Sequence, residues 1–365
     1  MKPVLFVTNH APPARVGAFK ALHEREDVVF ALIGGGVRHG GGVTTTELPF
    51  PVIRPPERAV ARLAASRRHR AVIAGLSGRT ALPAAYAGAR AARIPFVLWA
   101  TIWRHPRTPA HALSYLPLRH IYRHADAVVT YGPHVSAYVS ERRGSPEGVF
   151  VAPQAVSADE FGKEISPELR AHARAHAGAP PVGGFLALFV GRLVREKGVR
   201  VLLDAWRRAG LGEDAVLALA GEGPLRAEAA RQPDDVQALG FVPRDHLPAL
   251  YAAADVLVLP SIRTETFLEP WGLVVNEAMH QGTPVIVTDA VGAARGGLVR
   301  DGRNGFVVPQ RDAAALATRL QSLSQSERLR ESLGRAGRRD VASFNYAAWV
   351  AGMRRGLAAV GSDPA

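Results

Sequence analysis

The chain has 365 residues, 47% of them hydrophobic and 21% charged, which is typical of a globular protein with room for two domains. It contains no cysteine, which excludes disulfides, a thiol nucleophile and a cysteine-ligated metal. Its net charge is +13, and residues 1–160 hold 20 Lys and Arg against 10 Asp and Glu, while residues 161–365 hold 25 against 22. The excess positive charge therefore lies in the N-terminal half. It reflects either a coding bias or attraction to an anionic membrane, a charged acceptor or nucleic acid.

The beginning of the chain leads straight into a strand-like run, VLFVT, without a signal-peptide pattern. No apolar run reaches about 18 residues, the length that a membrane-spanning helix needs. We therefore expect a cytoplasmic protein, with peripheral contact at the inner face of the membrane as an open alternative.

The N-terminal half alternates apolar runs with helical patterns, the rhythm of a parallel sheet. Strands are predicted at residues 4–8, 28–34, 71–75, 94–100, 126–132 and 148–154, and helices at 16–23, 80–93, 111–124 and 134–142. The glycine-rich segment 34–42 has no helical pattern after it, so a flexible loop is favoured over a dinucleotide fingerprint. This half predicts one doubly wound domain.

The segment Pro56 to Arg70 gathers five arginines. On a helix, Val60, Leu63 and Ala64 would form a weak apolar stripe with arginines around the rest. A solvated face and a membrane-surface element both fit this pattern.

A Pro/Gly-rich connector at residues 176–184 precedes a second series of strands, at 185–190, 215–221, 236–241, 255–260, 284–289 and 305–309. We place the domains at 1–160 and 161–340, although a boundary just after Val156 is also consistent with the pattern. A helical stretch at 339–360 ends the chain, and residues 341–365 form a third segment.

Two cations follow the first strand of the second series. The strand runs into Gly191, Arg192, Glu196, Lys197 and Gly198 before an amphipathic helix. A diphosphate bound at the end of a buried strand would require this charge compensation, although exposed Arg and Lys also occur simply as solvated residues.

A second cluster lies in the segment Thr264 to Asp289, where Glu269 and Glu277 stand eight residues apart. They bracket the carboxyl end of a buried strand and the first turns of a short helix ended by Gly282, where open α/β sheets bind ligands. Gly272 and Leu273 lie near the helix start, whose N–H groups favour an anion. Carboxylates for hydroxyls and amides for phosphate together predict a nucleotide-sugar site, while acidic residues near a helix start are also common without a ligand.

At these residues the chain resembles the retaining glycosyltransferases of the GT-B fold that carry a Glu-x7-Glu motif. The resemblance runs in order through GRLVREKG, LALAGEGPL, ALGFVPRDHLPALYAAADVLVLPS, EPWGLVVNEAM, GTPVIVTD and LVRDGRNGFVV. It implies two Rossmann-like domains facing a central cleft, an acceptor domain first and a donor domain second. It also implies that the C-terminal helix crosses back to the first domain, and a solvated helix on the second domain is the alternative.

The resemblance implies a role for each motif residue. Arg192 and Lys197 would bind the donor diphosphate, Glu269 the sugar hydroxyls and Glu277 the ribose, with amides around Gly272, Leu273 and Val274 on phosphate and sugar. The donor would be a UDP- or GDP-linked sugar, and its transfer to a polysaccharide, a lipid-linked acceptor or a small metabolite would proceed by front-face attack with retention.

The first domain matches the family less closely. Relatives place two adjacent glycines after the first strand, and here Gly17 stands alone, as a donor-binding residue or as a helix-start residue. Relatives often carry a histidine after the strand at 94–100, where this chain has Thr101. His105 is the candidate for that active-site role, with Trp103 and Arg104 as candidates for acceptor contact.

Several rivals remain. HExxH and Asp-x-Asp patterns are absent, so we expect no metal and no cofactor beyond the donor. An epimerase of the same fold would convert the donor without an acceptor. A phosphorylase would need a pyridoxal lysine, and the only lysines besides Lys197 are Lys2, Lys20 and Lys163. A basic nucleic-acid-binding protein rests on charge alone, so no nucleic-acid partner is expected.

Overall fold

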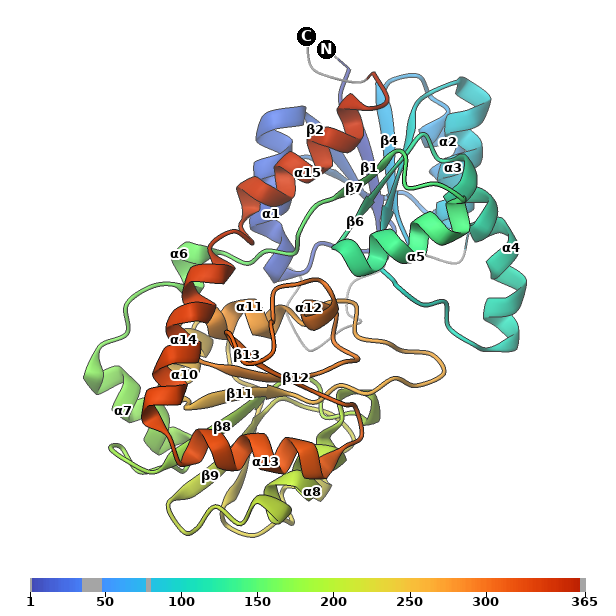
Figure 1. The fold of residues 1–365 in the computed structure, drawn as a ribbon. Helices are drawn as coiled ribbons and strands as arrows, with labels where there is room; N and C mark the ends of the chain where they lie inside the picture. Colours follow the sequence, from blue (N-terminus) through green and yellow to red (C-terminus); the bar gives the residue numbers. More distant parts are fainter. Residues whose placement is uncertain (1, 35–47, 77–79, 362–365) are drawn as a thin grey trace. The chain divides into compact units, whose positions relative to one another are not determined.

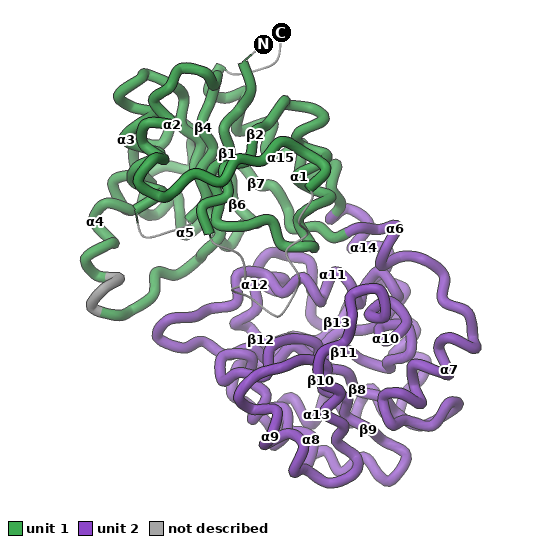
Figure 2. The backbone as a smooth tube through the Cα atoms, turned by 180° about the vertical axis from the view of Figure 1, so that it is seen from behind, with its two compact units in different colours: residues 1–156, 345–365 green, residues 157–344 purple. Residues whose placement is uncertain are grey.

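A computed structural model describes residues 2–34, 48–76 and 80–361 of the chain. The chain divides into two compact units, shown in Figure 2: residues 1–156 with 345–365, and residues 157–344. The first break follows Val156 and the second precedes Asn345. The predicted boundaries at 160 and 340 lie four residues from these breaks, and the helix that follows Asn345 is grouped with the first unit.

Unit 1 is built on a seven-stranded parallel sheet in the order β3-β2-β1-β4-β5-β6-β7 (Figure 1). Its helices lie on both faces of the sheet, α1 and α15 on one and α2 to α5 on the other. The strands are β1 (Val4–Thr8), β2 (Val28–Leu32), β3 (Val52–Ile53), β4 (Ala71–Gly75), β5 (Phe96–Ala100), β6 (Ala127–Thr130) and β7 (Val149–Val151). The helices are α1 (Pro13–Glu26), α2 (Val60–Ala64), α3 (Ala81–Ala92), α4 (Pro109–His124), α5 (Pro133–Arg143) and α15 (Tyr346–Ala358), and a 3-10 turn, η1 (Glu57–Ala59), precedes α2.

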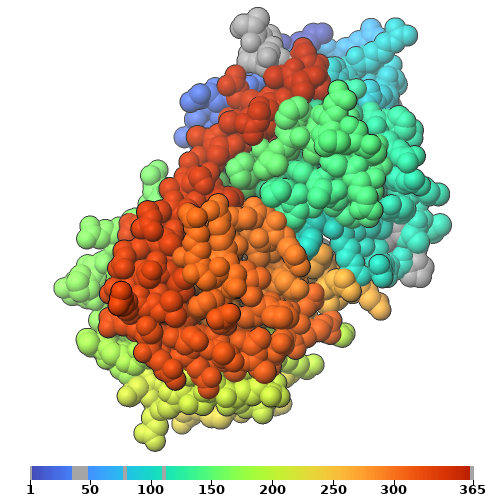
Figure 3. All heavy atoms as spheres, viewed as in Figure 1, coloured from blue at the N-terminus to red at the C-terminus, as the bar shows by residue number. Residues whose placement is uncertain are grey.

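Unit 2 has a six-stranded parallel sheet in the order β10-β9-β8-β11-β12-β13. The strands are β8 (Phe185–Val190), β9 (Ala215–Ala220), β10 (Val236–Gly240), β11 (Val256–Leu259), β12 (Val285–Thr288) and β13 (Gly305–Val308). The helices are α6 (Ala158–Phe161), α7 (Pro167–His176), α8 (Val199–Ala209), α9 (Arg226–Ala229), α10 (Leu247–Ala253), α11 (Leu273–His280), α12 (Gly292–Arg295), α13 (Ala313–Ser324) and α14 (Glu327–Val341), with a 3-10 turn, η2 (Arg195–Lys197). In Figure 3 the face of this unit turned to the viewer is formed largely by its last part, coloured orange to red.

Both sheets are buried on both faces, which explains why their strands read as continuous apolar runs. Every residue of β1, β4, β5 and β9 is buried. In the middle of the first sheet, Val4 stands beside Val28 on one side and Ala71 on the other. The predicted fold class of two parallel, doubly wound sheets is therefore confirmed.

Two sequence expectations in this part of the molecule need correction, and a third cannot be compared with the structure. Helix α2 ends at Ala64, so Arg67, Arg68 and Arg70 follow the helix instead of sharing its faces. The predicted helical stretch 339–360 is two helices, because the side chain of Asn345 accepts a hydrogen bond from the Ala348 N–H and starts α15 anew. The glycine-rich loop at 34–42 lies outside the described residues beyond Gly34.

Gly17 does not start a helix but lies inside α1, where α1 packs against α15. A Cβ at position 17 would lie 2.4 Å from the ring of Tyr346. The structure thus gives this glycine a packing role within unit 1.

A buried carboxylate ties α1 and α15 to the rest of unit 1. The Glu26 side chain is 1% exposed and forms ion pairs with Arg70 (2.7 Å) and with Arg354 (2.6 Å). Arg70 also donates to the backbone carbonyl of Glu26. Removing one partner of a buried pair leaves the other charge uncompensated.

We therefore expect Glu26→Ala to destabilise unit 1 by about 3 kcal/mol, because Arg70 would stay buried without its carboxylate. Glu24→Ala is the matched control, since Glu24 is 57% exposed and pairs with Lys20 at the surface, where a pair contributes at most about 1 kcal/mol. Calorimetric unfolding of both variants would measure this difference, and equal melting temperatures would contradict the assignment.

Candidate functional site

The sheet of unit 2 reverses its winding direction between β8 and β11. The chain passes from β8 outward to β9 and β10, and then returns to β11 on the other side of β8 before continuing to β12 and β13. Loops leaving neighbouring strands at such a switch point diverge, and this is where open α/β sheets bind ligands. The predicted donor-binding residues of unit 2 follow these two strands, whereas Gly17 lies in α1 of unit 1.

The loop after β8 is held by backbone contact with the loop after β9. The N–H of Leu193 donates to the Glu222 carbonyl at 2.8 Å. Cβ atoms at Gly221 and Gly223 would lie 1.8 Å and 2.5 Å from the carbonyl oxygens of Gly191 and Leu193, and both glycines have φ near +150°. These two glycines allow the loop after β9 to lie close against the loop after β8, which positions Arg192. Two glycines alone do not make a dinucleotide-binding fingerprint.

Lys197 and Glu269 meet at the switch point. The Lys197 ammonium forms an ion pair with Glu269 Oε2, and the Ser261 hydroxyl donates to the same oxygen at 3.0 Å. The two charged side chains are only 15% and 8% exposed. The Lys197 ammonium also lies 5.6 Å from the ring centre of Phe267. Lys197 and Glu269 therefore form an ion pair that has little contact with water.

Glycines bring the loops of this pair together. Gly198 has φ +73°, and a Cβ there would lie 1.9 Å from the Pro260 carbonyl oxygen, which leads into Ser261. On the other side, the Gly292 N–H donates to the Glu269 carbonyl at 3.1 Å. A Cβ at Gly292 would lie 2.0 Å from the carbonyl oxygen of Pro270. Glu269 is thus fixed from its own backbone as well as from its side chain.

Glu277 lies on α11 with a different set of partners. Its Oε2 accepts a hydrogen bond from the Tyr251 hydroxyl at 2.6 Å, and its Oε1 lies 3.8 Å from Arg244. Arg244 also pairs with Glu160 at 2.7 Å and stacks over the ring of Phe161. Burial raises the pKa of Glu277, while the Tyr251 hydrogen bond and the Arg244 charge oppose that rise. Burial likewise raises the pKa of Tyr251 well above its ordinary value.

The structure brings Lys197 and Glu269 together and gives the other predicted residues separate surroundings. Arg192 pairs with Glu196 at 3.2 Å and is 38% exposed. Gly272, with φ +93°, is the residue before α11, and Leu273 and Val274 are its first two residues. The start of α11 therefore lies between the two glutamates in the sequence, as the motif predicts.

Sequence reasoning did not single out Ser261, Tyr251 and Arg244. Ser261 could have been found, because it follows the buried strand β11 by two residues. The contacts of Tyr251 and Arg244 with Glu277 join α10 and the preceding loop to α11 across 26 and 33 positions, and no local pattern indicates such pairings.

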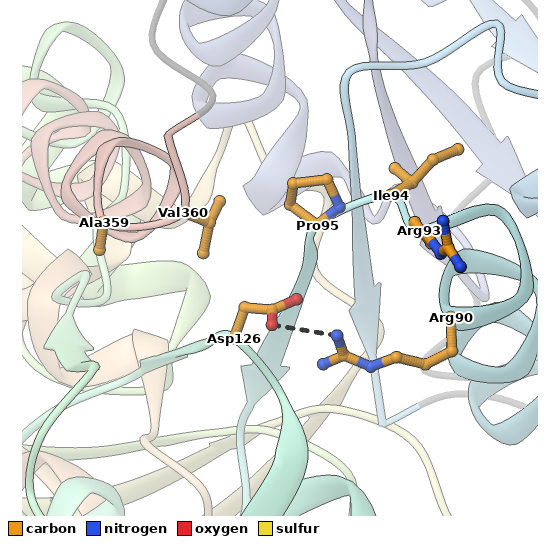
Figure 4. A pocket seen from close by; sticks show the side chains of 7 residues that line it. All are labelled: Arg90, Arg93, Ile94, Pro95, Asp126, Ala359 and Val360. Carbon is orange, nitrogen blue, oxygen red and sulfur yellow. Dashed lines mark hydrogen bonds and ion pairs between the residues drawn. The ribbon is translucent and has the colours of Figure 1, made fainter.

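Described residues of unit 1 line two cavities of similar size. One, of about 580 Å³, borders Arg90, Arg93, Pro95 and Asp126, just before β5 and β6 begin (Figure 4). Asp126 is paired with Arg90 at 3.0 Å. The cavity lies at the amino ends of the strands, whereas such sheets bind ligands at the carboxyl ends.

The other cavity, of about 570 Å³, follows the carboxyl end of β5 and includes Arg104 and His105. The ring of His105 packs 5.1 Å from that of Tyr115. The ring of Trp103 lies 5.3 Å from that of His134, and Thr101 follows β5 directly. The predicted acceptor-side residues thus gather on one loop of unit 1.

Over the described residues, no three His, Asp or Glu side chains come together as a metal-binding group. Within the same part of the chain, no helix combines the length and apolar character needed to cross a membrane.

Residues 176–340 match the family model for glycosyl transferases group 1. The chain is 37% identical over 177 residues to the phosphatidyl-myo-inositol mannosyltransferase of Mycobacterium leprae, a match that covers 47% of this chain and 45% of that protein. It is 32% identical over 233 residues to a GDP-mannose-dependent phosphatidylinositol monomannoside mannosyltransferase of Mycolicibacterium smegmatis, covering 60% and 59%. The matches thus span about half the length of these relatives.

Solved structures resemble the fold over nearly the whole chain. Anabaena HepE in complex with UDP superposes with a TM-score of 0.80 at 20% identity, covering 98% of this chain and 99% of that one. WaaG, a glycosyltransferase of lipopolysaccharide biosynthesis, gives a TM-score of 0.72 at 18% identity, covering 98% and 100%. The chain therefore has the GT-B fold, and its residues 176–340 match the glycosyl transferases group 1 family.

Proposed function

We propose that this protein is a retaining glycosyltransferase that moves a sugar from a nucleoside diphosphate sugar to an acceptor. The observation that carries the proposal is the Lys197–Glu269 pair with Ser261 at the switch point of the second sheet. A partly buried cation beside a buried carboxylate suits a ligand that carries both a diphosphate and hydroxyl groups. The family match over residues 176–340 supports the same activity.

Each residue has a proposed role. Lys197 and Arg192 bind the diphosphate, and Glu269 accepts hydrogen bonds from sugar hydroxyls. The N–H groups at the start of α11, at Gly272, Leu273 and Val274, complete the phosphate contacts. Glu277 accepts from the ribose hydroxyls. HepE structures contain UDP or UDP-glucose, and a relative is named for GDP-mannose, which favours a UDP- or GDP-linked hexose here.

In the proposed reaction, the bond from the anomeric carbon to the phosphate oxygen breaks and a bond from that carbon to the acceptor oxygen forms on the same face. The acceptor proton passes to the departing phosphate. Lys197 and Arg192 stabilise the charge that develops there, so catalysis consists mainly of positioning and electrostatic stabilisation. His105, in unit 1, remains a candidate for an acceptor-side role.

The surroundings of Glu277 support a binding role. Burial disfavours its charged form, and a neutral glutamine could keep the Tyr251 contact. A carboxylate at this position therefore weakens the fold relative to that alternative at neutral pH. A carboxylate accepts stronger hydrogen bonds from hydroxyl groups than a neutral amide does, and this gives a reason for the carboxylate at position 277.

The two glutamates are expected to act on different parts of the donor. Glu277→Gln should weaken the free nucleoside diphosphate and the nucleotide sugar alike, because a lost hydrogen bond to a charged group costs about 1.5–3 kcal/mol. Glu269→Gln should weaken only the nucleotide sugar, and it should leave the affinity for free nucleotide unchanged or higher because Lys197 is released from its carboxylate.

Titration calorimetry with UDP, GDP and their sugars would measure these affinities, with the exposed Glu265→Gln as the matched control. Wild-type affinity for the free nucleotide in Glu277→Gln would overturn the ribose assignment. Steady consumption of the donor without any acceptor would indicate an epimerase instead of a transferase.

Removal of either cation should lower turnover more than nucleotide affinity, because both act on the leaving diphosphate. We expect this for Arg192→Ala and for Lys197→Ala. The double variant Lys197→Ala/Glu269→Gln separates the loss of the cation from the exposure of an unpaired buried carboxylate. Turnover of the wild-type protein should persist in EDTA, because Arg192 and Lys197 supply the positive charge. Loss of activity that manganese or magnesium restores would refute a metal-independent site.

Glu277 should also make stability depend on pH. A carboxyl whose pKa is raised on folding contributes its full stability below the unfolded value of about 4.5 and loses it as the pH rises through the folded value. Glutamine does not titrate, so Glu277→Gln should gain stability relative to wild type as the pH rises above about 4.5. Calorimetric melting temperatures across this range, with Glu265→Gln for comparison, would test it, and a constant difference would contradict the shift.

A further inference from the structure

The cavity after β5 differs from an ordinary surface hollow in its lining. It has a volume of about 570 Å³ and lies between the loop after β5, helix α4 and helix α5. None of the described lining residues is acidic. Most are cationic or aromatic, namely Arg104, Arg107, Arg142, His105, Tyr115 and Tyr138. A space of this kind attracts an anion.

Arg142 is a partly buried contributor to this charge. Its side chain is 20% exposed and its guanidinium lies 3.5 Å from the centre of the Tyr138 ring. Its Nε is buried and has no hydrogen-bond partner among the described residues. The carboxylate that pairs with it, Glu141, is 75% exposed, so solvent screens that pair. The lining of the cavity thus carries arginines and no acidic residue.

Helix α4 adds an apolar surface beside this cavity. Ala112 and Tyr115 of α4 line the cavity, and the neighbouring Leu113 and Leu116 are 82% and 68% exposed. Residues three and four apart on a helix share a face, so the exposed leucines stand next to the side that borders the cavity. The helix, residues 109–124, contains no acidic residue, and Arg119 and Arg123 are exposed on it.

We propose that this cavity binds the phosphate group of an amphiphilic acceptor, with Leu113 and Leu116 in contact with its apolar part. The inference rests on the proposed transferase function, which requires a site for the acceptor. A phosphate accepts hydrogen bonds from several guanidinium groups at once, which matches three arginines around one cavity. Exposed leucines at its rim match an acyl or similar apolar chain, which a soluble sugar phosphate lacks.

The test uses the full chain and two phosphate probes. Flotation with phosphatidylcholine vesicles, with and without phosphatidylglycerol, measures binding to a phospholipid surface, and calorimetry with glycerol 3-phosphate measures binding of the soluble group. We expect wild type to bind both, with vesicle binding that requires phosphatidylglycerol and falls as salt rises.

Three variants separate the contributions. Arg104→Ser/Arg107→Ser should bind both probes at least about tenfold more weakly, since each lost charged hydrogen bond is equivalent to about tenfold in affinity. Leu113→Ser/Leu116→Ser should lose vesicle binding and keep glycerol 3-phosphate binding. Arg58→Ser/Arg68→Ser, which removes the same charge from the exposed segment before β4, should bind both probes like wild type.

The outcomes discriminate clearly. Equal loss in the Arg58/Arg68 control would assign the effect to overall charge and overturn the cavity. Binding of glycerol 3-phosphate without vesicle binding would overturn the amphiphilic acceptor, and absence of both would overturn the phosphate site. UDP or GDP affinity, measured alongside, should be unchanged in all three variants, so failure of the transferase proposal would show as a wild type that binds no nucleotide.

Discussion

The site in unit 2 depends on the approach of two loops close enough for Lys197 and Glu269 to meet. A lysine and a glutamate 72 positions apart form a pair because Gly198 lies against the Pro260 carbonyl and Gly292 lies against that of Pro270. Side chains at either glycine would push the loops apart and leave two poorly hydrated charges without each other, which is costly. The backbone packing around the switch point is therefore a condition for the electrostatics of the site.

Within this frame, two glutamates of one motif acquire different properties from their neighbours. Both are almost fully buried, yet Glu269 faces an ammonium and Glu277 faces a neutral phenol with an arginine farther away. Glu269 thus has a full opposite charge beside it, whereas burial raises the pKa of Glu277 against the opposing hydrogen bond from Tyr251. The motif thus supplies one carboxylate coupled to a cation and one held largely by hydrogen bonding, which suits recognition of two different parts of a ligand.

The amino-acid sequence predicted the parts of this arrangement that follow local rules. Buried strands appear as apolar runs, so all strands except the short β3 could be predicted. The location of Arg192, Lys197 and Glu269 after strand ends, and of Glu277 in the helix that follows, could be predicted as well. Contacts that depend on tertiary packing could not, among them Tyr251 with Glu277 and Tyr346 against Gly17. The break between α14 and α15 could not be predicted either, because the sequence is helical in pattern on both sides and only the N-cap at Asn345 marks the start of α15.

The positive charge of unit 1 illustrates why composition alone identifies no binding surface. Several arginines there serve the fold: Arg70 and Arg354 neutralise the buried Glu26, and Arg143 donates to the backbone carbonyls of Tyr122 and Ala125. Arg70 therefore does not belong to a solvent-facing basic patch with Arg67 and Arg68, although the three are near neighbours in the sequence. The loop after β5 differs because its arginines border a cavity and stand beside exposed leucines. Charge becomes evidence for a ligand only where geometry provides a space and a second kind of contact for it.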